Sequence, residues 1–293
     1  MRIASLLPSA TEIVAALGRA DGLVGVTFEC DTPAGITEHC PVIVHGLTTT
    51  DKTAAEIDTM VRELAASGAP MYHLDERALT QAAPDVILTQ DLCRVCALPA
   101  GDVDAAMTHL NQIGCNAQVI SLDPHRLGEV IDTITTVGEA IGASDEARAL
   151  TTELFAQLRA AQTNGAAGRR AFILEWPDPP FLAGHWVPDL ITAAGADAVL
   201  AAPGERSVET TWDAISAADP EVVIVAPCGF GLNDAVSMAT DALPLLPSSA
   251  EVWAIDANGY TVRPGPRLVD AVTQIGRALS GADPDPEIMV RIR

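Results

Sequence analysis

Short apolar runs alternate with helical hydrophobic patterns through the first part of the chain. RIASLL and GLVGVTF have the length of buried strands, whereas AAEIDTMVRELAASG repeats its apolar residues every three or four positions, as an amphipathic helix does. PDVILT and AQVISL continue the strand series, and each follows a helical segment. Strands that alternate with helices predict parallel sheets joined by right-handed crossovers.

The first helix is expected to open at a capping box. Ser9 and Glu12 have the three-residue spacing of that motif, and Gly18 is expected to end the helix. Ser9 would then lie at a helix N-terminus, just beyond the end of the first strand.

From Arg126 the pattern is helical over a long stretch. The apolar residues of the first helix fall on one face and are Leu127, Val130, Ile131, Ile134, Val137 and Ile141. A second helix follows and carries Asp145 and Glu146 in its first turn, where the helix dipole favours acids. Beyond QTNGAAGRR the alternation of strands and helices resumes, and the tail ADPDPEIMVRIR is expected to be irregular. The chain is therefore predicted to hold two α/β lobes with a helical segment between them.

The chain is strongly acidic. Its 293 residues carry 39 acidic and 17 basic side chains, for a net charge of −22. This charge argues against binding to nucleic acid or docking on an anionic membrane, because phosphates would be repelled. No apolar run approaches the ~20 residues of a membrane span. The start MRIASLLPSATEI lacks the pattern of a secretory signal, so we expect a cytoplasmic protein; with an export signal trimmed away, the periplasm or cell surface is expected instead.

Polar and aromatic residues follow the ends of the predicted strands. In open parallel sheets, ligands bind beyond the carboxyl ends of the strands, so these residues are candidates for a ligand site. The candidates are Ser9, Glu29, Gln90, Asp91, Glu175, Trp176, Phe230, Tyr260 and Arg263. Arg263 and its neighbour Arg267 are suited to bind a carboxylate or phosphate with two hydrogen bonds, or to pair with surface acids. The sequence leaves both roles open.

The segment EWPDPPFLAGHWVPDL concentrates rigid side chains. It brings together Trp176, Phe181, His185 and Trp186 in a chain in which only 4% of the residues are aromatic. Flat aromatic walls with a few polar groups suit a large organic ligand. We therefore interpret this segment as ligand-contacting, while His185 is equally compatible with a loop histidine whose partners are local.

Six cysteines are present, and Cys93 and Cys96 form a Cys-x-x-Cys pair directly after a predicted strand. The pair is compatible with buried structural thiols, with a redox dithiol or with part of a metal site. A stabilising disulfide is the least expected of the options in a reducing cytosol. Cys40 and Cys115 are interpreted as structural.

Two further cysteines extend the metal interpretation. Cys30 and Cys228 also follow strand ends, and together with Cys93 and Cys96 they would complete a four-sulfur site, with His185 as a substitute ligand. Thiolate ligands favour zinc or an iron–sulfur cluster over calcium or magnesium.

Motifs of catalysis are missing from the sequence. The chain has no Gly-x-Ser-x-Gly elbow, no phosphate loop of the Gly-x4-Gly-Lys-Ser/Thr type and no dinucleotide fingerprint. Ser9 precedes a helix but has no evident partner base. The sequence therefore predicts that the protein is not an enzyme.

Several segments resemble, in order, the periplasmic binding protein-like family that captures vitamin B12, haem and iron–siderophore complexes. The resemblance covers about residues 2–280. It is carried by RIASLLPSATEIVAALG, LVGVTFECDTP, PDVILT, DPPFLAGHWVPDLITAAGADAVL, TTWDAISAADPEVVIV and RPGPRLVDAVTQI. TQDLCRVCA and EWPDPPFLAGHWVP also resemble a cytoplasmic-looking subgroup of that family.

The resemblance implies two Rossmann-like lobes with parallel sheets, at residues 1–143 and 164–293, bridged by one long helix at 144–163. It also implies a ligand cleft between the lobes. The positions that face the ligand in such proteins fall at or beside Glu29, Gln90, Glu175, Trp176, Phe181, His185, Phe230 and Tyr260. Relatives deliver their ligand to a permease of an ABC transporter, so such a permease is the expected partner of an exported protein.

Two functional hypotheses result. The first is a carrier or sensor, similar to substrate-binding proteins, that binds a corrinoid such as cobalamin or a related metal-tetrapyrrole or iron chelate. In it, His185 would be placed to ligate the metal of the ligand. The second is a cytosolic metalloprotein that holds a metal ion or an iron–sulfur cluster through its cysteines, with a redox role as an option.

Overall fold

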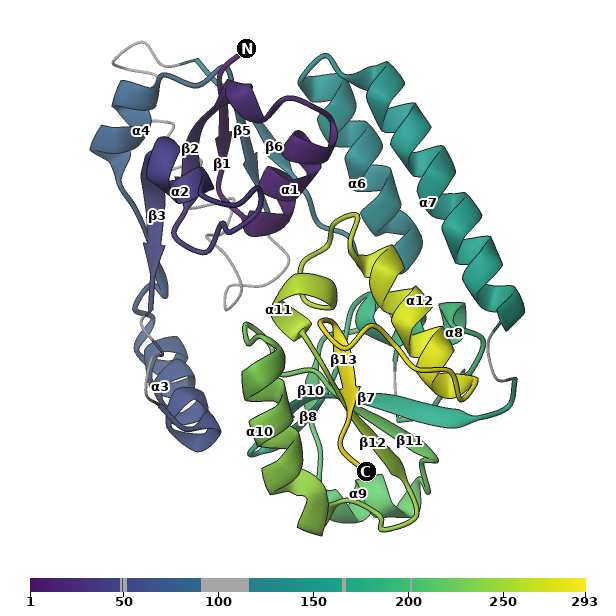
Figure 1. Cartoon of the computed structure of the whole chain (residues 1–293). Helices are drawn as coiled ribbons and strands as arrows, with labels where there is room; N and C mark the ends of the chain where they lie inside the picture. Colours follow the sequence, from purple (N-terminus) through teal and green to yellow (C-terminus); the bar gives the residue numbers. More distant parts are fainter. Residues whose placement is uncertain (48, 50–51, 91–115, 165–166, 201) are drawn as a thin grey trace. The chain divides into compact units, whose positions relative to one another are not determined.

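The structure, a computed structural model, describes residues 1–47, 49, 52–90, 116–164, 167–200 and 202–293. The chain divides into two compact units (Figure 1). Unit 1 is Met1–Asp123 with Asp132–Thr151, and unit 2 is Pro124–Ile131 with Thr152–Arg293. Each unit is built on its own β-sheet, as the alternating pattern predicts.

The sheet of unit 1 has a parallel centre. In the described part of the chain its strand order is β4-β3-β2-β1-β5-β6. All neighbours are parallel except β4, which runs antiparallel to β3 at one edge. The strands span Ile3–Ser5 (β1), Leu23–Thr27 (β2), Val42–Gly46 (β3), Tyr72–Leu74 (β4), Val86–Thr89 (β5) and Gln118–Ser121 (β6). The expectation of a purely parallel sheet is therefore corrected at this edge.

The helices of unit 1 begin and end with local signals. They span Pro8–Ala16 (α1), Ile36–His39 (α2), Ala54–Ser67 (α3) and Glu76–Ala82 (α4), with a 3-10 turn at Ala20–Gly22 (η1). α3 opens with a capping box, in which Thr53 Oγ1 accepts the Glu56 N–H and the Glu56 carboxylate accepts the Thr53 N–H. Asp75 caps α4 by accepting the N–H of Ala78.

The predicted capping box of the first helix is wrong. α1 begins at Pro8, so Ser9 and Glu12 both lie inside the helix, and Leu7 occupies the N-cap position without a side-chain hydrogen bond. Pro8 suits the first helical position because its φ is already fixed near the helical value and its missing N–H has no helical partner to lose. The predicted end is close to the observed one, since Gly18, with a φ of +68°, lies just beyond the helix.

Apolar side chains of the strands form the core of unit 1. A buried cluster comprises Ala4, Leu6, Ile43, Val44, Leu79 and Ile87. Burying one Leu or Ile side chain is worth roughly 1.5–3 kcal/mol. Packing in this cluster therefore stabilises β1, β3 and β5 and helps to fix the residues that follow the ends of the neighbouring strands.

Two long helices, α6 (Leu127–Ala140) and α7 (Ser144–Asn164), follow β6. The residues predicted on the apolar face of the first are all buried, namely Leu127, Val130, Ile131, Ile134, Val137 and Ile141. The helices approach closely, because a Cβ added at Gly138 would lie 2.4 Å from the Cβ of Ala147. α7 spans nearly the same residues as the helix predicted at 144–163, while its role as the connection between two lobes stays a prediction; the division into units falls inside both α6 and α7.

The sheet of unit 2 has the strand order β10-β8-β7-β11-β12-β13 in the described part of the chain, and β9 pairs with β7. β7, β11 and β12 are parallel, whereas β8, β10 and β13 join by antiparallel pairing. The strands span Arg170–Pro177 (β7), Pro180–Leu182 (β8), Asp197–Ala198 (β9), Val208–Glu209 (β10), Val222–Val225 (β11), Glu251–Ile255 (β12) and Met289–Arg291 (β13). The tail that was expected to be irregular thus adds an edge strand.

The helices of unit 2 span Val187–Ala193 (α8), Trp212–Ala217 (α9), Leu232–Ala242 (α10), Ala257–Tyr260 (α11) and Leu268–Leu279 (α12), with a 3-10 turn at Leu243–Leu245 (η2). The core joins β7, β11 and β12 to α10 through Phe172, Leu174, Val223, Val225, Ala235, Ala239, Val252 and Ala254. No helix in the described residues is long and apolar enough to cross a membrane.

Candidate functional site

In unit 1, a chain of small polar groups lies where β1 and β2 end. Thr11 Oγ1, from α1, donates to Ser5 Oγ at 2.8 Å, and Ser5 Oγ donates to the Leu7 carbonyl at 2.9 Å. The Cys30 thiol lies 3.1 Å from Thr11 Oγ1 and 3.6 Å from Thr27 Oγ1. These contacts explain how the polar side chains are accommodated in a buried position.

Cys30 and Cys40 are both buried free thiols. Burial, and to a lesser degree the Cys30 thiol, raise the pKa of Cys40 to about 11. A thiol with so high a pKa stays protonated at neutral pH, and the thiolate is the form that ligates metals. The structural role predicted for Cys40 agrees with this environment.

The other unit 1 candidates differ in how deeply they are buried. Ser9 and Gln90 are buried, at 2% and 6% exposed, whereas Glu29 is half-buried and donates its N–H to Thr27 Oγ1 at 3.1 Å. Asp91, Cys93 and Cys96 lie outside the described residues. Ligand contact by any of these residues stays a prediction.

In unit 2, two aromatic rings meet at the carboxyl ends of β7 and β11. β7 runs on to Pro177, so Glu175 and Trp176 belong to the strand that they were predicted to follow, whereas Phe230 lies beyond β11. The rings of Trp176 and Phe230 are tilted by 53° with centroids 5.7 Å apart, and both residues are half-buried. The Trp176 indole N–H donates to the Asp178 carbonyl at 3.1 Å, which fixes the orientation of the ring. Phe181, on β8, is the register partner of Trp176, so the two side chains share a face of the hairpin.

Glu175, next to Trp176, is connected by hydrogen bonds to the loop that contains Gly184. Its Oε2 accepts the Ser207 hydroxyl at 2.8 Å, and Ser207 Oγ in turn accepts the N–H of Gly184 at 3.1 Å. Its carbonyl accepts the N–H of Cys228 at 3.2 Å, which links the ends of β7 and β11. Glu175, predicted from its strand-end position, therefore lies beside Trp176 and holds the loop that leads to His185.

His185 is held in an unusual backbone conformation. Its φ is +50°, in the left-handed region that non-glycine residues rarely adopt. Its N–H donates to the Glu205 carbonyl at 2.6 Å, and its carbonyl accepts the N–H of Gly204 at 2.9 Å. Strained residues of this kind persist only where the surroundings fix them firmly, and they are concentrated at functional sites.

The loop packs backbone against backbone at Gly184. A Cβ at this position would lie 2.3 Å from Ser207 N and 2.6 Å from the Glu205 carbonyl oxygen. Only glycine therefore allows the 205–207 segment to approach this closely. The hydrogen bonds of His185 depend on that approach.

The imidazole of His185 has no partner for one nitrogen. Its Nε2 is buried and makes no hydrogen bond to any described residue. Burial is the main cause that lowers the pKa of His185, and the nearby His125 and Arg206 add to the effect. The ring is therefore neutral at neutral pH.

Trp186 differs from its neighbour Trp176. It is 6% exposed, and its indole N–H donates to the Thr261 carbonyl at 2.9 Å. A buried and fully hydrogen-bonded indole of this kind packs the protein interior. A ligand contact by Trp186 stays a prediction.

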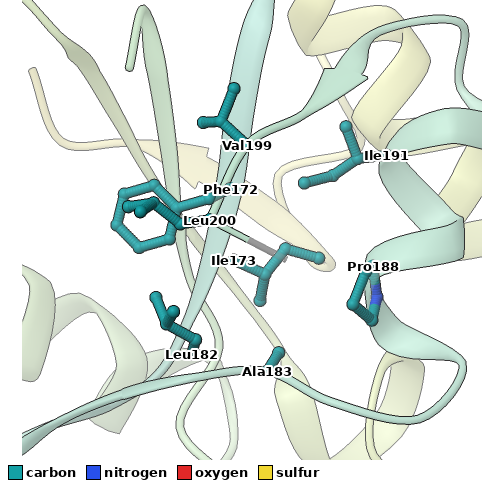
Figure 2. Close-up of a pocket in the computed structure, with 8 residues that line it drawn as sticks. All are labelled: Phe172, Ile173, Leu182, Ala183, Pro188, Ile191, Val199 and Leu200. Atoms are coloured by element: carbon teal, nitrogen blue, oxygen red, sulfur yellow. The ribbon is translucent and has the colours of Figure 1, made fainter. Parts of the chain in front are cut away.

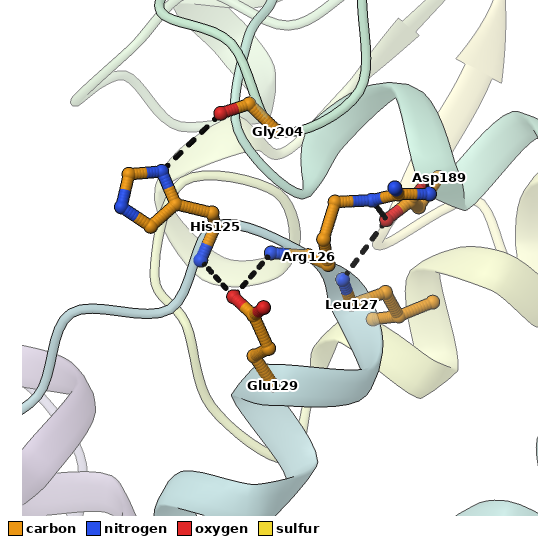
Figure 3. Close-up of polar contacts among 6 residues, drawn as sticks. All are labelled: His125, Arg126, Leu127, Glu129, Asp189 and Gly204. Carbon is orange, nitrogen blue, oxygen red and sulfur yellow. Dashed lines mark hydrogen bonds and ion pairs between the residues drawn. The ribbon is translucent and has the colours of Figure 1, made fainter.

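His125 was not among the predicted residues, yet the structure brings it beside His185. The two ring centroids are 5.9 Å apart. His125 Nδ1 lies 3.2 Å from the Gly204 carbonyl, and the backbone N–H groups of His125 and Arg126 both donate to Glu129 Oε2, as Figure 3 shows. The local signal was present in DPHRLGE, where Glu129 can cap the helix that follows, but nothing in the sequence indicates the pairing with His185.

The last predicted candidates follow β12. Arg263 is buried at 6% exposed and donates to the Asn258 side-chain oxygen at 3.0 Å. The Arg267 guanidinium lies 5.4 Å from the centroid of the half-buried Tyr260 ring. Burial raises the pKa of the Tyr260 hydroxyl, and Arg267 acts in the opposite direction. Both arginines thus have partners within unit 2, which is compatible with either predicted role.

A small apolar cavity lies among β7, β8 and α8 (Figure 2). Its volume is about 10 Å³, and it is lined by Phe172, Ile173, Leu182, Ala183, Pro188, Ile191, Val199 and Leu200. Space of this size holds about one water at most. It is a packing gap beneath the aromatic segment, too small for an organic ligand.

No group of three or more His, Cys, Asp or Glu side chains suited to a metal ion occurs in the described part of the chain. Cys30 is buried and Cys228 is half-buried, and Cys93 and Cys96 lie outside the described residues. The predicted four-sulfur site therefore has no support from the described residues, and no zinc ion or iron–sulfur cluster is assigned to it.

Comparison with known proteins identifies related sequences and folds. A family model described as "Periplasmic binding protein" matches residues 3–244. The vitamin B12-binding protein of Vibrio cholerae is 23% identical to this chain over 278 residues, which are 94% of this chain and 87% of that protein.

Solved structures share the architecture. A periplasmic heme binding protein from Pseudomonas aeruginosa superposes with a TM-score of 0.70 at 18% identity, covering 99% of this chain and 97% of that one. A possible iron-binding, periplasmic solute-binding protein from Staphylococcus epidermidis gives a TM-score of 0.67 at 18% identity, covering 94% and 96%. At these identities the likeness establishes the fold, and it confirms the predicted α/β architecture with two sheets.

Proposed function

Because this chain belongs to the periplasmic binding protein family, we propose that it binds a corrinoid, or a related metal-tetrapyrrole or iron chelate, as a carrier or sensor. Relatives named for vitamin B12 and heme binding support this class of ligand. The proposed role is binding rather than catalysis. For a carrier, a permease of the ABC type is the partner that would receive the ligand.

The observation that carries the proposal is the ring pair of Trp176 and Phe230. Both rings are half-buried and lie 5.7 Å apart at the carboxyl ends of neighbouring parallel strands, where Trp176 is the last residue but one of β7 and Phe230 follows β11. Ligands of open α/β sheets bind at that end of the strands. Large flat ligands gain most from aromatic walls, since each ring offers a wide apolar surface at little cost in side-chain entropy.

Polar groups next to the rings complete a binding surface. Glu175 is held by Ser207, and the Trp176 indole is held by the Asp178 carbonyl. A site whose side chains are already fixed loses little conformational freedom when the ligand binds. The arrangement is therefore suited to a rigid ligand with a polar rim, which corrinoids, haems and siderophore complexes all share.

The test is a titration of the purified protein with cyanocobalamin, haemin and a ferric siderophore. We expect one of the three to change its visible spectrum on binding and to raise the melting temperature. A ligand present at 100 times its Kd stabilises the folded state by about 2.7 kcal/mol, so the shift is measurable. If none of the three produces either change at roughly tens of micromolar, the proposal is wrong.

A further inference from the structure

Two histidines of unit 2, His125 and His185, lie together although they are far apart in the chain. His125 lies two residues before the start of α6, and His185 lies in the loop between β8 and α8. Their ring centroids are 5.9 Å apart and their planes are inclined by 56°. Imidazole nitrogens are the most common protein ligands of transition metals.

The hydrogen bond of His125 determines which nitrogen carries its proton. Nδ1 lies 3.2 Å from the Gly204 carbonyl oxygen, which can only accept. Nδ1 is therefore the protonated nitrogen, and in the neutral ring Nε2 keeps its lone pair. Metal-ligating histidines typically show this pattern, with one nitrogen bound to a carbonyl and the other free for the metal. Figure 3 shows the second ring nitrogen of His125 turned away from Gly204.

His185 supplies the second nitrogen. Its Nε2 is buried and has no hydrogen-bond partner among the described residues. A buried polar atom without a partner is costly and calls for an explanation, such as a missing ion. His125 is exposed, so an ion has access from that side.

We propose that His125 and His185 together bind one divalent first-row transition-metal ion through their Nε2 atoms. Metal–nitrogen bonds of about 2.0–2.1 Å place the centres of two rings on one ion roughly 5–6 Å apart. The observed separation of 5.9 Å meets this requirement. The backbone bonds of His185 to Glu205 and Gly204 hold the second ring in place before the metal arrives.

The protein provides only two ligands in the described residues, so other donors complete the coordination of the ion. Imidazole ligands favour Co²⁺, Ni²⁺, Cu²⁺ and Zn²⁺ over Mg²⁺ and Ca²⁺.

The shape of the site limits its ligand. The free positions of a tetrapyrrole metal lie on opposite faces of the macrocycle, so two adjacent imidazoles cannot both bind it. The site therefore suits a hydrated ion or an open chelate, and it does not depend on the proposed binding of a corrinoid.

A second histidine pair has to be removed before the test. His45 and His73 are directly opposite each other on β3 and β4, and both are exposed. Opposed side chains of an antiparallel pair lie on the same face and would also hold an ion. The parent protein for the test is therefore the variant with His45→Ala and His73→Ala.

The experiment is an anaerobic titration of this parent with Co²⁺, followed by visible absorption and by equilibrium dialysis. We expect one bound Co²⁺, without the thiolate charge-transfer band that a cysteine ligand would produce. His125→Asn or His185→Asn should weaken binding by about 100-fold, because loss of even an outer partner of a metal ligand costs 10–100-fold. His39→Asn, which removes an exposed histidine elsewhere, should leave binding unchanged.

Asparagine is chosen because it keeps a donor near the Nδ1 position and tolerates the left-handed backbone of His185. X-ray absorption of the Co²⁺-loaded parent gives a second readout that needs no further substitution, and two imidazoles per cobalt are expected. Absence of binding, binding unaffected by both Asn variants, or a cobalt with fewer than two imidazoles would overturn the proposal. The adjacent geometry also predicts that both histidines are needed for binding of free Co²⁺ and of an open Co²⁺ chelate. Neither haemin nor cyanocobalamin is expected to need both of them.

Discussion

Arg126 and Asp189 form a two-pronged ion pair, in which Arg126 Nε and a terminal guanidinium nitrogen each lie 2.8 Å from an Asp189 carboxylate oxygen. The same carboxylate accepts the N–H of Leu127, the first residue of α6, at 3.0 Å. Asp189 belongs to α8, so one side chain joins the start of α6 to α8 within unit 2 (Figure 3). Through this junction, the position of His125 becomes fixed relative to the loop of His185.

Asp189→Ala is expected to destabilise the protein more than Arg126→Ala. The Asp189 side chain is 13% exposed and has three donors to satisfy, whereas the Arg126 side chain is 53% exposed. Loss of the carboxylate leaves the Leu127 N–H without its cap, and we expect a loss of about 1–2 kcal/mol in the free energy of unfolding. Urea unfolding of the two variants measures the difference. An equal loss in both would show that the capping contact contributes nothing.

Gly184→Ala is expected to be strongly destabilising. The added Cβ would lie 2.3 Å from Ser207 N and 2.6 Å from the Glu205 carbonyl oxygen. Both atoms belong to the backbone and cannot rotate away. We expect a loss of about 2–3 kcal/mol in the free energy of unfolding. Gly128→Ala is the matched control, because no atom lies within 4 Å of its added Cβ and the residue is in α6. The control should gain about 0.5–1 kcal/mol from helix propensity, and a similar loss in both variants would contradict the role of Gly184.

The pKa of Cys40, about 11, predicts a loss of stability at alkaline pH. The ordinary pKa of a cysteine thiol is 9.0, so the thiol of the unfolded chain ionises first as the pH rises. Stability from this residue is therefore complete below pH 9 and is lost progressively between about pH 9 and about pH 11. Cys40→Ala removes this contribution. The difference in unfolding free energy between wild type and variant should shrink across that interval, and a constant difference would contradict the raised pKa.

The two tryptophans of the aromatic segment are expected to respond differently to substitution by Phe. Trp186→Phe removes a buried donor and leaves the Thr261 carbonyl without that bond, so we expect a loss of about 1–2 kcal/mol in the free energy of unfolding. Trp176→Phe removes only a bond to the exposed Asp178 two residues away, and a loss below about 0.5 kcal/mol is expected. Thermal unfolding of the two variants measures the difference. A larger loss of stability in Trp176→Phe than in Trp186→Phe would contradict the structural role assigned to Trp186.

Most of the fold could be predicted from hydrophobic periodicity. The apolar face from Leu127 to Ile141 is buried throughout because it repeats at helical spacing over several turns. The strand β8 and the edge strand β13 were missed, since each is only three residues long and lies in a proline-rich segment. The predicted start of the first helix was wrong because Ser9 and Glu12 fit a capping box with Ser9 as N-cap, whereas Pro8 supplies an equally good start and moves the N-cap two residues earlier, to Leu7.

The candidate site could be predicted only in part. The position of Glu175 and Trp176 near the carboxyl end of a strand was visible in the sequence, because the change from apolar to polar residues marks that end, but β7 continues through both residues to Pro177. The burial of Trp186 could not be predicted, since the sequence around a loop tryptophan is the same whether the indole faces solvent or the core. The closeness of His125 and His185 depends on the packing of the 204–207 segment, which no local pattern encodes.

Binding of cyanocobalamin, haemin and a ferric siderophore to wild type and to Trp176→Ala tests the proposed function most directly. We predict that one of these ligands binds wild type and that Trp176→Ala raises its Kd about tenfold, the equivalent of 1.4 kcal/mol of lost contact. Phe155→Ala, which removes a 39% exposed aromatic side chain on α7, should leave the Kd unchanged. Failure of all three ligands to bind wild type, or a Kd that is the same in Trp176→Ala, would contradict the account.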